Sequence, residues 1–115
     1  MADRVLFIGW NRPVPGREKQ ALDNLGKWAP FFSKLQADGR IESFETVILE
    51  AHGGDLNGFH LVKGNTEQIF GIRQDETYLN LIIEAGYCVQ GIGIINGYIG
   101  DGITNAMTRY VKLIS

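Results

Sequence analysis

The amino-acid sequence predicts one α+β domain over residues 1–115, with the ferredoxin-like order β-α-β-β-α-β and a further C-terminal helix. Four runs rich in β-branched and aromatic residues have the composition of strands. Longer segments between them carry apolar residues at three- and four-residue steps, the spacing of amphipathic helices. The 115 residues are enough to bury one core, and no linker or repeat divides them.

Composition and charge exclude several classes of partner. Lys and Arg total 11 against 13 Asp and Glu, and no basic stripe is present, so we expect no nucleic-acid partner. No apolar run approaches the roughly 20 residues that span a bilayer, so we expect no membrane partner either. The single cysteine, Cys88, cannot form an intramolecular disulfide and fits a reducing cytoplasm.

The first strand and the first helix come before residue 40. Arg4–Asn11 reads as a strand, and Arg17–Ala37 carries helical periodicity. Pro30 is expected to interrupt and kink this helix near Gly26, because its ring removes a donor and crowds the carbonyl four residues earlier. The predicted apolar stripe comprises Ala21, Leu22, Leu25, Trp28, Ala29, Phe32 and Leu35.

Two strands joined by a turn follow the first helix. They are predicted at Arg40–Ala51 and Asn57–Lys63, with the turn at His52–Asp55. In this register His60 lies opposite Glu50, although a slip of one residue would separate them.

The second helical region begins at Asn65, which can cap it while Gln68 reaches back. It extends to about residue 84 in two pieces, since Asp75 has the character of a second capped start, and Gly86 ends it. The predicted buried stripe comprises Tyr78, Leu79, Ile82 and Ile83.

A glycine-rich strand over Tyr87–Ile99 and a last helix capped by Asp101 complete the chain. Strands one, two and four carry apolar residues on both faces, whereas helices can cover only one face of the sheet. An uncovered apolar face of several hundred Å² is a liability on a monomer, and two sheets packed face to face would bury it. We therefore expect a homodimer formed through the sheet faces.

Four stretches of the chain resemble small bacterial proteins of the dimeric α+β barrel superfamily. They are Pro15–Glu18 ahead of an aromatic-bearing helix, Asp38–Glu45, Leu56–Phe59 and Gly97–Gly102. The superfamily includes YciI-like, antibiotic-biosynthesis-monooxygenase-like and stress-responsive A/B-barrel proteins. The resemblance implies a homodimer with a cavity between each sheet and its helices, and it transfers no reaction because the subgroups use different residues there.

His60 is the best candidate for chemistry, as a proton-transfer group between two apolar residues of a strand. A weaker alternative is a metal site of Glu50, His52 and His60, if the hairpin register holds. The plain alternative is that His52 belongs to the turn and His60 is an ordinary half-buried histidine.

Aromatic and polar residues around the predicted cavity are candidate ligand contacts. Arg73 falls between two helical pieces where exposed caps could bind an anion, although a surface ion pair with Asp75 or Glu76 is the simpler interpretation. The candidate ligand-binding residues are Trp10, Asn11, Trp28, Phe32, Arg73, Tyr78 and Tyr98.

These observations favour a protein that binds a small, mostly apolar or aromatic molecule, with no cofactor and with His60 available for proton transfer or oxygenase chemistry. One alternative is a non-catalytic, stress-associated or ligand-sensing dimer, favoured by the scarcity of inward polar groups. A second alternative is a metal-dependent lyase or isomerase that uses the Glu50, His52 and His60 set.

Overall fold

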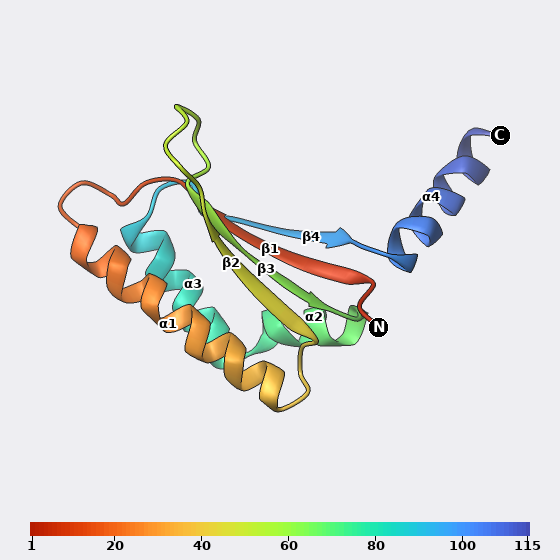
Figure 1. Cartoon of the computed structure of the whole chain (residues 1–115), viewed down its shortest axis with the longest axis horizontal. Coiled ribbons are helices and arrows are strands. Elements are labelled where there is room, and N and C mark those ends of the chain that lie inside the picture. Colours follow the sequence, from red (N-terminus) through yellow and green to blue (C-terminus); the bar gives the residue numbers. More distant parts are fainter.

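In the computed structural model, which describes residues 1–115, four strands form one antiparallel sheet in the order β2-β3-β1-β4. Three helices cover one face, and a fourth projects from the sheet edge (Figure 1). In chain order the elements are β1 (Arg4–Trp10), α1 (Glu18–Ala37), β2 (Ser43–Ile48), β3 (Gly58–Gly64), α2 (Thr66–Gln74), α3 (Glu76–Cys88), β4 (Gly93–Tyr98) and α4 (Asp101–Ile114). The predicted α+β fold class and element order are confirmed, with α2 and α3 as the two pieces of the second helical region.

Helix α1 is continuous across Pro30, so the predicted interruption does not end it. Pro30 and Gly26 are both exposed, and water can reach the carbonyl that loses its helical donor. The buried face of the helix differs from the predicted stripe, since Leu22 is 69% exposed whereas Asn24 is 4% exposed. The buried residues of the helix are Ala21, Asn24, Trp28, Phe32 and Leu35.

The β2–β3 hairpin is shorter than predicted and has a different register. Thr46 lies opposite His60, so the predicted pairing of Glu50 with His60 is wrong. The physical reason is the length of the connection, because residues 49–57 form a loop closed by the Leu49 N–H bond to the Asn57 carbonyl.

The caps predicted for α2 and α3 are confirmed. Asn65 and Gln68 form a reciprocal capping box, and Asp75 accepts hydrogen bonds from the first turn of α3. However, α3 continues through Gly86 to Cys88, whose buried thiol donates to the Glu84 carbonyl. Strand β4 therefore begins at Gly93 instead of residue 87.

The predicted buried stripe of α3 is correct only at Tyr78 and, in part, at Ile82. Leu79 and Ile83 are exposed, whereas Leu81 and Ala85 are buried. Apolar residues surround most of this helix, so their periodicity did not determine which side faces the sheet.

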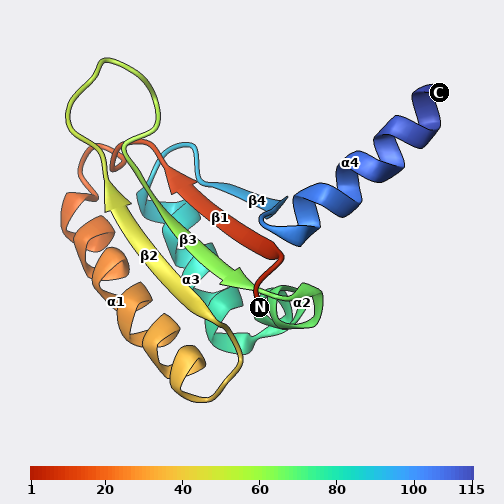
Figure 2. The same cartoon turned by 45° about the vertical axis from the view of Figure 1, so that its right-hand side comes forward.

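Helix α4 leads away from the body of the protein (Figure 2). Gly100 occupies its N-cap position without a side-chain bond, so the predicted cap by Asp101 is wrong: Asp101 is already the first helical residue. None of the helices combines the length and the apolar character needed to span a bilayer.

The core lies between the helices and one face of the sheet, which we call the inner face. Leu6, Ile8 and Val62 of this face are fully buried against α1 and its neighbours. The opposite face, called the outer face below, carries no helix (Figure 1). By strand alternation its apolar side chains are Val5, Phe7, Val47, Phe59, Leu61 and Ile95.

Candidate functional site

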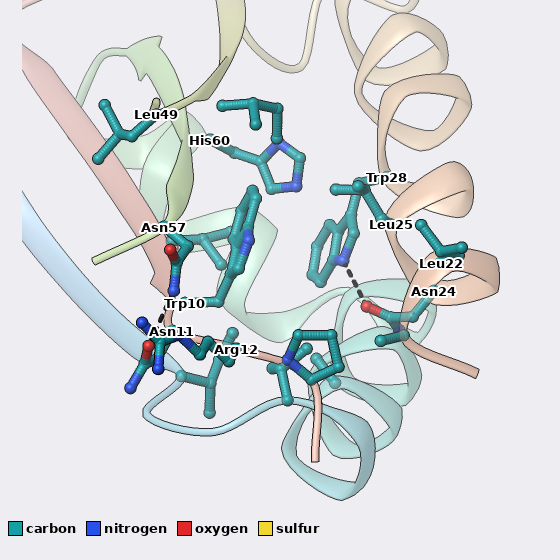
Figure 3. A pocket seen from close by; sticks show the side chains of 17 residues that line it. Trp10, Asn11, Arg12, Leu22, Asn24, Leu25, Trp28, Leu49, Asn57 and His60 are labelled. Carbon is teal, nitrogen blue, oxygen red and sulfur yellow. Dashed lines mark hydrogen bonds between the residues drawn. The ribbon is translucent and has the colours of Figure 1, made fainter. Parts of the chain in front are cut away.

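A pocket of about 320 Å³ opens between α1 and the inner face, at the end of the sheet where β1 ends and β3 begins (Figure 3). Seventeen residues line it, and eleven of them are hydrophobic. Its only titratable lining residues are Arg12 and His60, and no carboxylate lines it. Pockets of this kind suit a mostly apolar molecule that is oriented by a few polar groups.

His60 is the polar group at the bottom of this pocket. Its side chain is 1% exposed, and its ring lies 4.9 Å from the Trp10 ring and 5.5 Å from the Trp28 ring between centroids. Nδ1 is 2.8 Å from the Thr46 hydroxyl oxygen, whereas Nε2 has no hydrogen-bond partner. Burial lowers the pKa of His60 from 6.5 to about 4, so the imidazole is uncharged at neutral pH.

A buried amide fixes the orientation of Trp28. The indole N–H donates to Asn24 Oδ1 at 3.0 Å (Figure 3). Asn24 Nδ2 in turn donates to the Leu81 carbonyl at 3.1 Å and to Glu84 at 3.0 Å. Lys27 pairs with the same carboxylate at 2.9 Å. Sequence analysis missed Asn24, although its spacing from Ala21 and Trp28 places it within the buried stripe.

Trp10 forms the opposite wall, and the backbone beneath it must be glycine. Trp10 pairs directly with Gly58, where a Cβ would lie 2.6 Å from the indole ring and 2.9 Å from the Val47 carbonyl oxygen. Beside it, Asn57 Nδ2 donates to Asn11 Oδ1 at 2.8 Å, which joins the segment after β1 to the segment before β3.

We expect Gly58→Ala to displace the Trp10 indole, because the added methyl overlaps both that ring and fixed backbone. The free energy of unfolding should fall by about 1–3 kcal/mol, and the Trp10 indole N–H resonance should shift. Gly86→Ala is the control, since Gly86 is exposed on α3, nothing lies within 4 Å of a Cβ there and alanine favours a helix, so no loss of stability is expected. Equal losses of stability in the two variants would contradict this account of Gly58.

No protein-family model matches the chain, and no curated protein matches its sequence. Solved structures do match. A dimeric ferredoxin-like protein of unknown function from Bacteroides fragilis has a TM-score of 0.61 at 10% identity, over 84% of this chain and 96% of that chain. The chain has the ferredoxin-like fold.

Two other structures with this fold are enzymes. The hydroxynitrile lyase from Passiflora edulis has a TM-score of 0.61 at 10% identity, over 87% of this chain and 96% of that chain. SnoaB, a cofactor-independent oxygenase from Streptomyces nogalater, has a TM-score of 0.52 at 15% identity, over 86% of this chain and 93% of that chain. At these identities the similarity establishes the ferredoxin-like fold and leaves the activity open.

The ferredoxin-like chain brings together four of the residues predicted from sequence, since His60, Trp10, Asn11 and Trp28 all line the pocket. Phe32 lies behind them, with its ring 5.3 Å from His60.

The other three predicted ligand contacts lie outside the pocket. Tyr78 is buried against Trp28, and burial raises the pKa of its hydroxyl, which has no hydrogen-bond partner. Tyr98 lies at the far end of the sheet opposite Arg4, whose guanidinium is 4.2 Å from the tyrosine ring centre. Arg73 donates to Asn96 at 2.8 Å and forms no ion pair with Asp75, which instead pairs with Arg40.

The metal alternative loses its basis with the hairpin register. No group of three or more His, Cys, Asp or Glu side chains is placed to hold a metal ion. His52 belongs to the exposed loop, where Nε2 lies 2.6 Å from the Leu56 carbonyl oxygen and Nδ1 accepts from the Gly54 N–H. Glu50, His52 and His60 therefore do not converge, because the loop carries the first two beyond the ends of the paired strands.

Proposed function

We propose that the protein binds a small, planar, mostly apolar organic molecule in the pocket between α1 and the inner face, through one polar group of that molecule. The observation that carries this proposal is the unpartnered Nε2 of His60. A buried polar atom without a partner costs about 1–3 kcal/mol, and a hydroxyl or carbonyl group of a ligand would remove that cost. Nε2 is out of contact with solvent in this structure, so the ligand would reach it by displacing the Trp10 or Trp28 ring that packs against His60. The indoles of Trp10 and Trp28 offer flat apolar walls on either side (Figure 3).

The low pKa of His60 favours ligand binding over base catalysis as the role of this residue. A general base works best when its pKa lies near the working pH, whereas the pKa of His60 is about 4. Moving a proton from a phenol of pKa about 10 to such an imidazole would cost about 8 kcal/mol. This figure leaves out the attraction between the phenolate and the imidazolium that would result. A carrier or ligand sensor is therefore the better supported function.

Proton transfer by His60 is the second candidate. Its support is the same free imidazole nitrogen, together with the fold shared with a hydroxynitrile lyase and a cofactor-independent oxygenase. In this function the ligand would lose its proton to His60 within the pocket. The negative charge of the resulting ligand anion would raise the pKa of His60.

We infer that the working unit is a homodimer joined through the outer faces. Phe7 and Phe59 stack there with ring centroids 5.1 Å apart, and Ile95 is 59% exposed. A ferredoxin-like protein of the same fold from Bacteroides fragilis is dimeric.

Binding can be tested by NMR on the two indole N–H resonances, because both tryptophans of the chain line the pocket. The probes are p-cresol and toluene, which differ by one hydroxyl group. We expect both to shift the two resonances, and p-cresol to bind several-fold more tightly, since a hydrogen bond contributes about 0.5–1.5 kcal/mol.

His60→Phe should abolish the preference for p-cresol while leaving toluene bound, because the phenyl ring preserves the aromatic wall without the nitrogen. His52→Gln is the control and should keep the preference. If neither probe shifts either indole resonance, the pocket is not a binding site for such molecules. An undiminished preference in His60→Phe would remove His60 from the proposal.

A further inference from the structure

Helix α4 has one strongly apolar side whose large side chains are all exposed. Ile103, Met107, Tyr110 and Ile114 follow one another at steps of three and four residues, so they share one side. Their exposed fractions are 49%, 50%, 55% and 67%. The opposite side carries polar residues such as Asn105 and Lys112.

The helix is attached to the body at one point only. Gly102 is its single buried residue, and a Cβ there would overlap the carbonyl oxygen of Asp3. Beyond this contact the helix leads outward, on the side of the sheet opposite α1 and α3 (Figure 1). A helix of 14 residues is marginal in water without packing, so its apolar side needs a cover.

The solvent-accessible area of the chain is larger than that of a compact monomer of the same mass. The accessible area is 7303 Å² for 12.8 kDa, whereas a compact monomer of that mass exposes about 6,300 Å². The radius of gyration is 15.6 Å against about 13 Å for a compact domain. The excess of roughly 1,000 Å² is comparable with the roughly 800 Å² that each partner buries in a stable interface.

The charges favour a protein partner over a lipid surface. Only Arg109 and Lys112 are basic in α4, Asp101 opposes them, and the whole chain has a net charge of −2. Helices that lie on anionic membranes carry many more cations than this.

We propose that α4 is an arm that docks its apolar side onto a second copy of this chain. The inference rests on the homodimer proposed above. It adds an interface to the contact between the outer faces, and in a two-fold dimer each copy gives one arm and receives the other. The arm begins at the outer-face side of an edge strand, so a second copy packed on that face comes within its reach (Figures 1 and 2).

Sedimentation equilibrium of the full chain and two matched variants tests the arm. Met107→Asp places a charge on the apolar side, and Asn105→Asp places the same side chain on the polar side. We expect a dimer for the wild type, a dissociation constant raised at least tenfold for Met107→Asp, and a change of less than twofold for Asn105→Asp. Because α4 lies outside the core and contains no tryptophan, the tryptophan band of the near-ultraviolet circular dichroism of both variants should match the wild type. Truncation before Ile103 should reproduce the Met107→Asp result.

A wild-type dimer that Met107→Asp does not weaken would overturn the arm and leave the pairing of outer faces intact. A wild type that remains monomeric at high micromolar concentration would overturn both. A third outcome would also overturn the arm, in favour of a membrane role for α4. In that outcome the wild type binds vesicles of anionic phospholipid, and Met107→Asp abolishes this binding but leaves self-association unchanged.

Discussion

Phe32→Ala is expected to lower the free energy of unfolding by about 3–5 kcal/mol. The Phe32 side chain is 0% exposed, and its ring lies between those of Trp28 and Phe44, at 5.5 and 5.3 Å between centroids. Its removal leaves a cavity in the centre of the core, which α1 and the sheet cannot close without moving other elements.

Urea unfolding at one protein concentration measures this loss. Phe31→Ala is the matched control, because Phe31 precedes Phe32 on the same helix and only packs against the edge of the core. We expect Phe31→Ala to cost less than half as much. If the two variants lose the same stability, the core is not centred on Phe32.

The order of the elements could be predicted from sequence because local chemistry marks their starts. The capping box at Asn65 and the capping carboxylate of Asp75 place two helix starts correctly. The ends of elements were less predictable, because a glycine is a weak stop. Gly86 lies on the exposed side of α3, where a missing side chain changes little, and the helix continues through it.

The candidate site could be predicted only in part, because it depends on register. His60 and Trp10 were identified from their strand positions. The contact between His60 and Thr46 could not be predicted, since it requires the length of the loop that joins β2 to β3. Tyr98 was expected at the cavity, but antiparallel pairing places the start of β4 beside the pocket and its end beside Arg4.

Asn24 shows a different limit of the sequence. Polar residues are normally assigned to the solvent side of a helix, yet this amide is buried and has partners for both its oxygen and its nitrogen. A buried polar residue at a stripe position is recognisable only once the groups that satisfy it, here Trp28 and the Leu81 carbonyl, are in place.

Lowering the pH from 7 to 5 is expected to reduce the free energy of unfolding by about 2 kcal/mol through His60 alone. Burial lowers the pKa of His60 from 6.5 to about 4 in the folded chain. Between pH 6.5 and pH 4 the unfolded chain binds a proton at His60 that the folded chain does not, so the free energy of unfolding decreases as the pH is lowered. The contribution is complete above about pH 6.5 and is lost as the pH falls toward 4.

Urea unfolding at pH 7, 6 and 5 measures this dependence, in a range chosen to avoid the carboxylates. Hydrogen bonds from Asn24 and Lys27 lower the pKa of Glu84, so its contribution is lost mainly below pH 5. His60→Gln should flatten the dependence, because the amide does not titrate, whereas His52→Gln should retain it. These are the only two histidines of the chain. If the slope of the unfolding free energy against pH survives in His60→Gln and disappears in His52→Gln, the titrating group is the loop histidine. The buried imidazole would then not be the neutral group that the proposed binding mode requires.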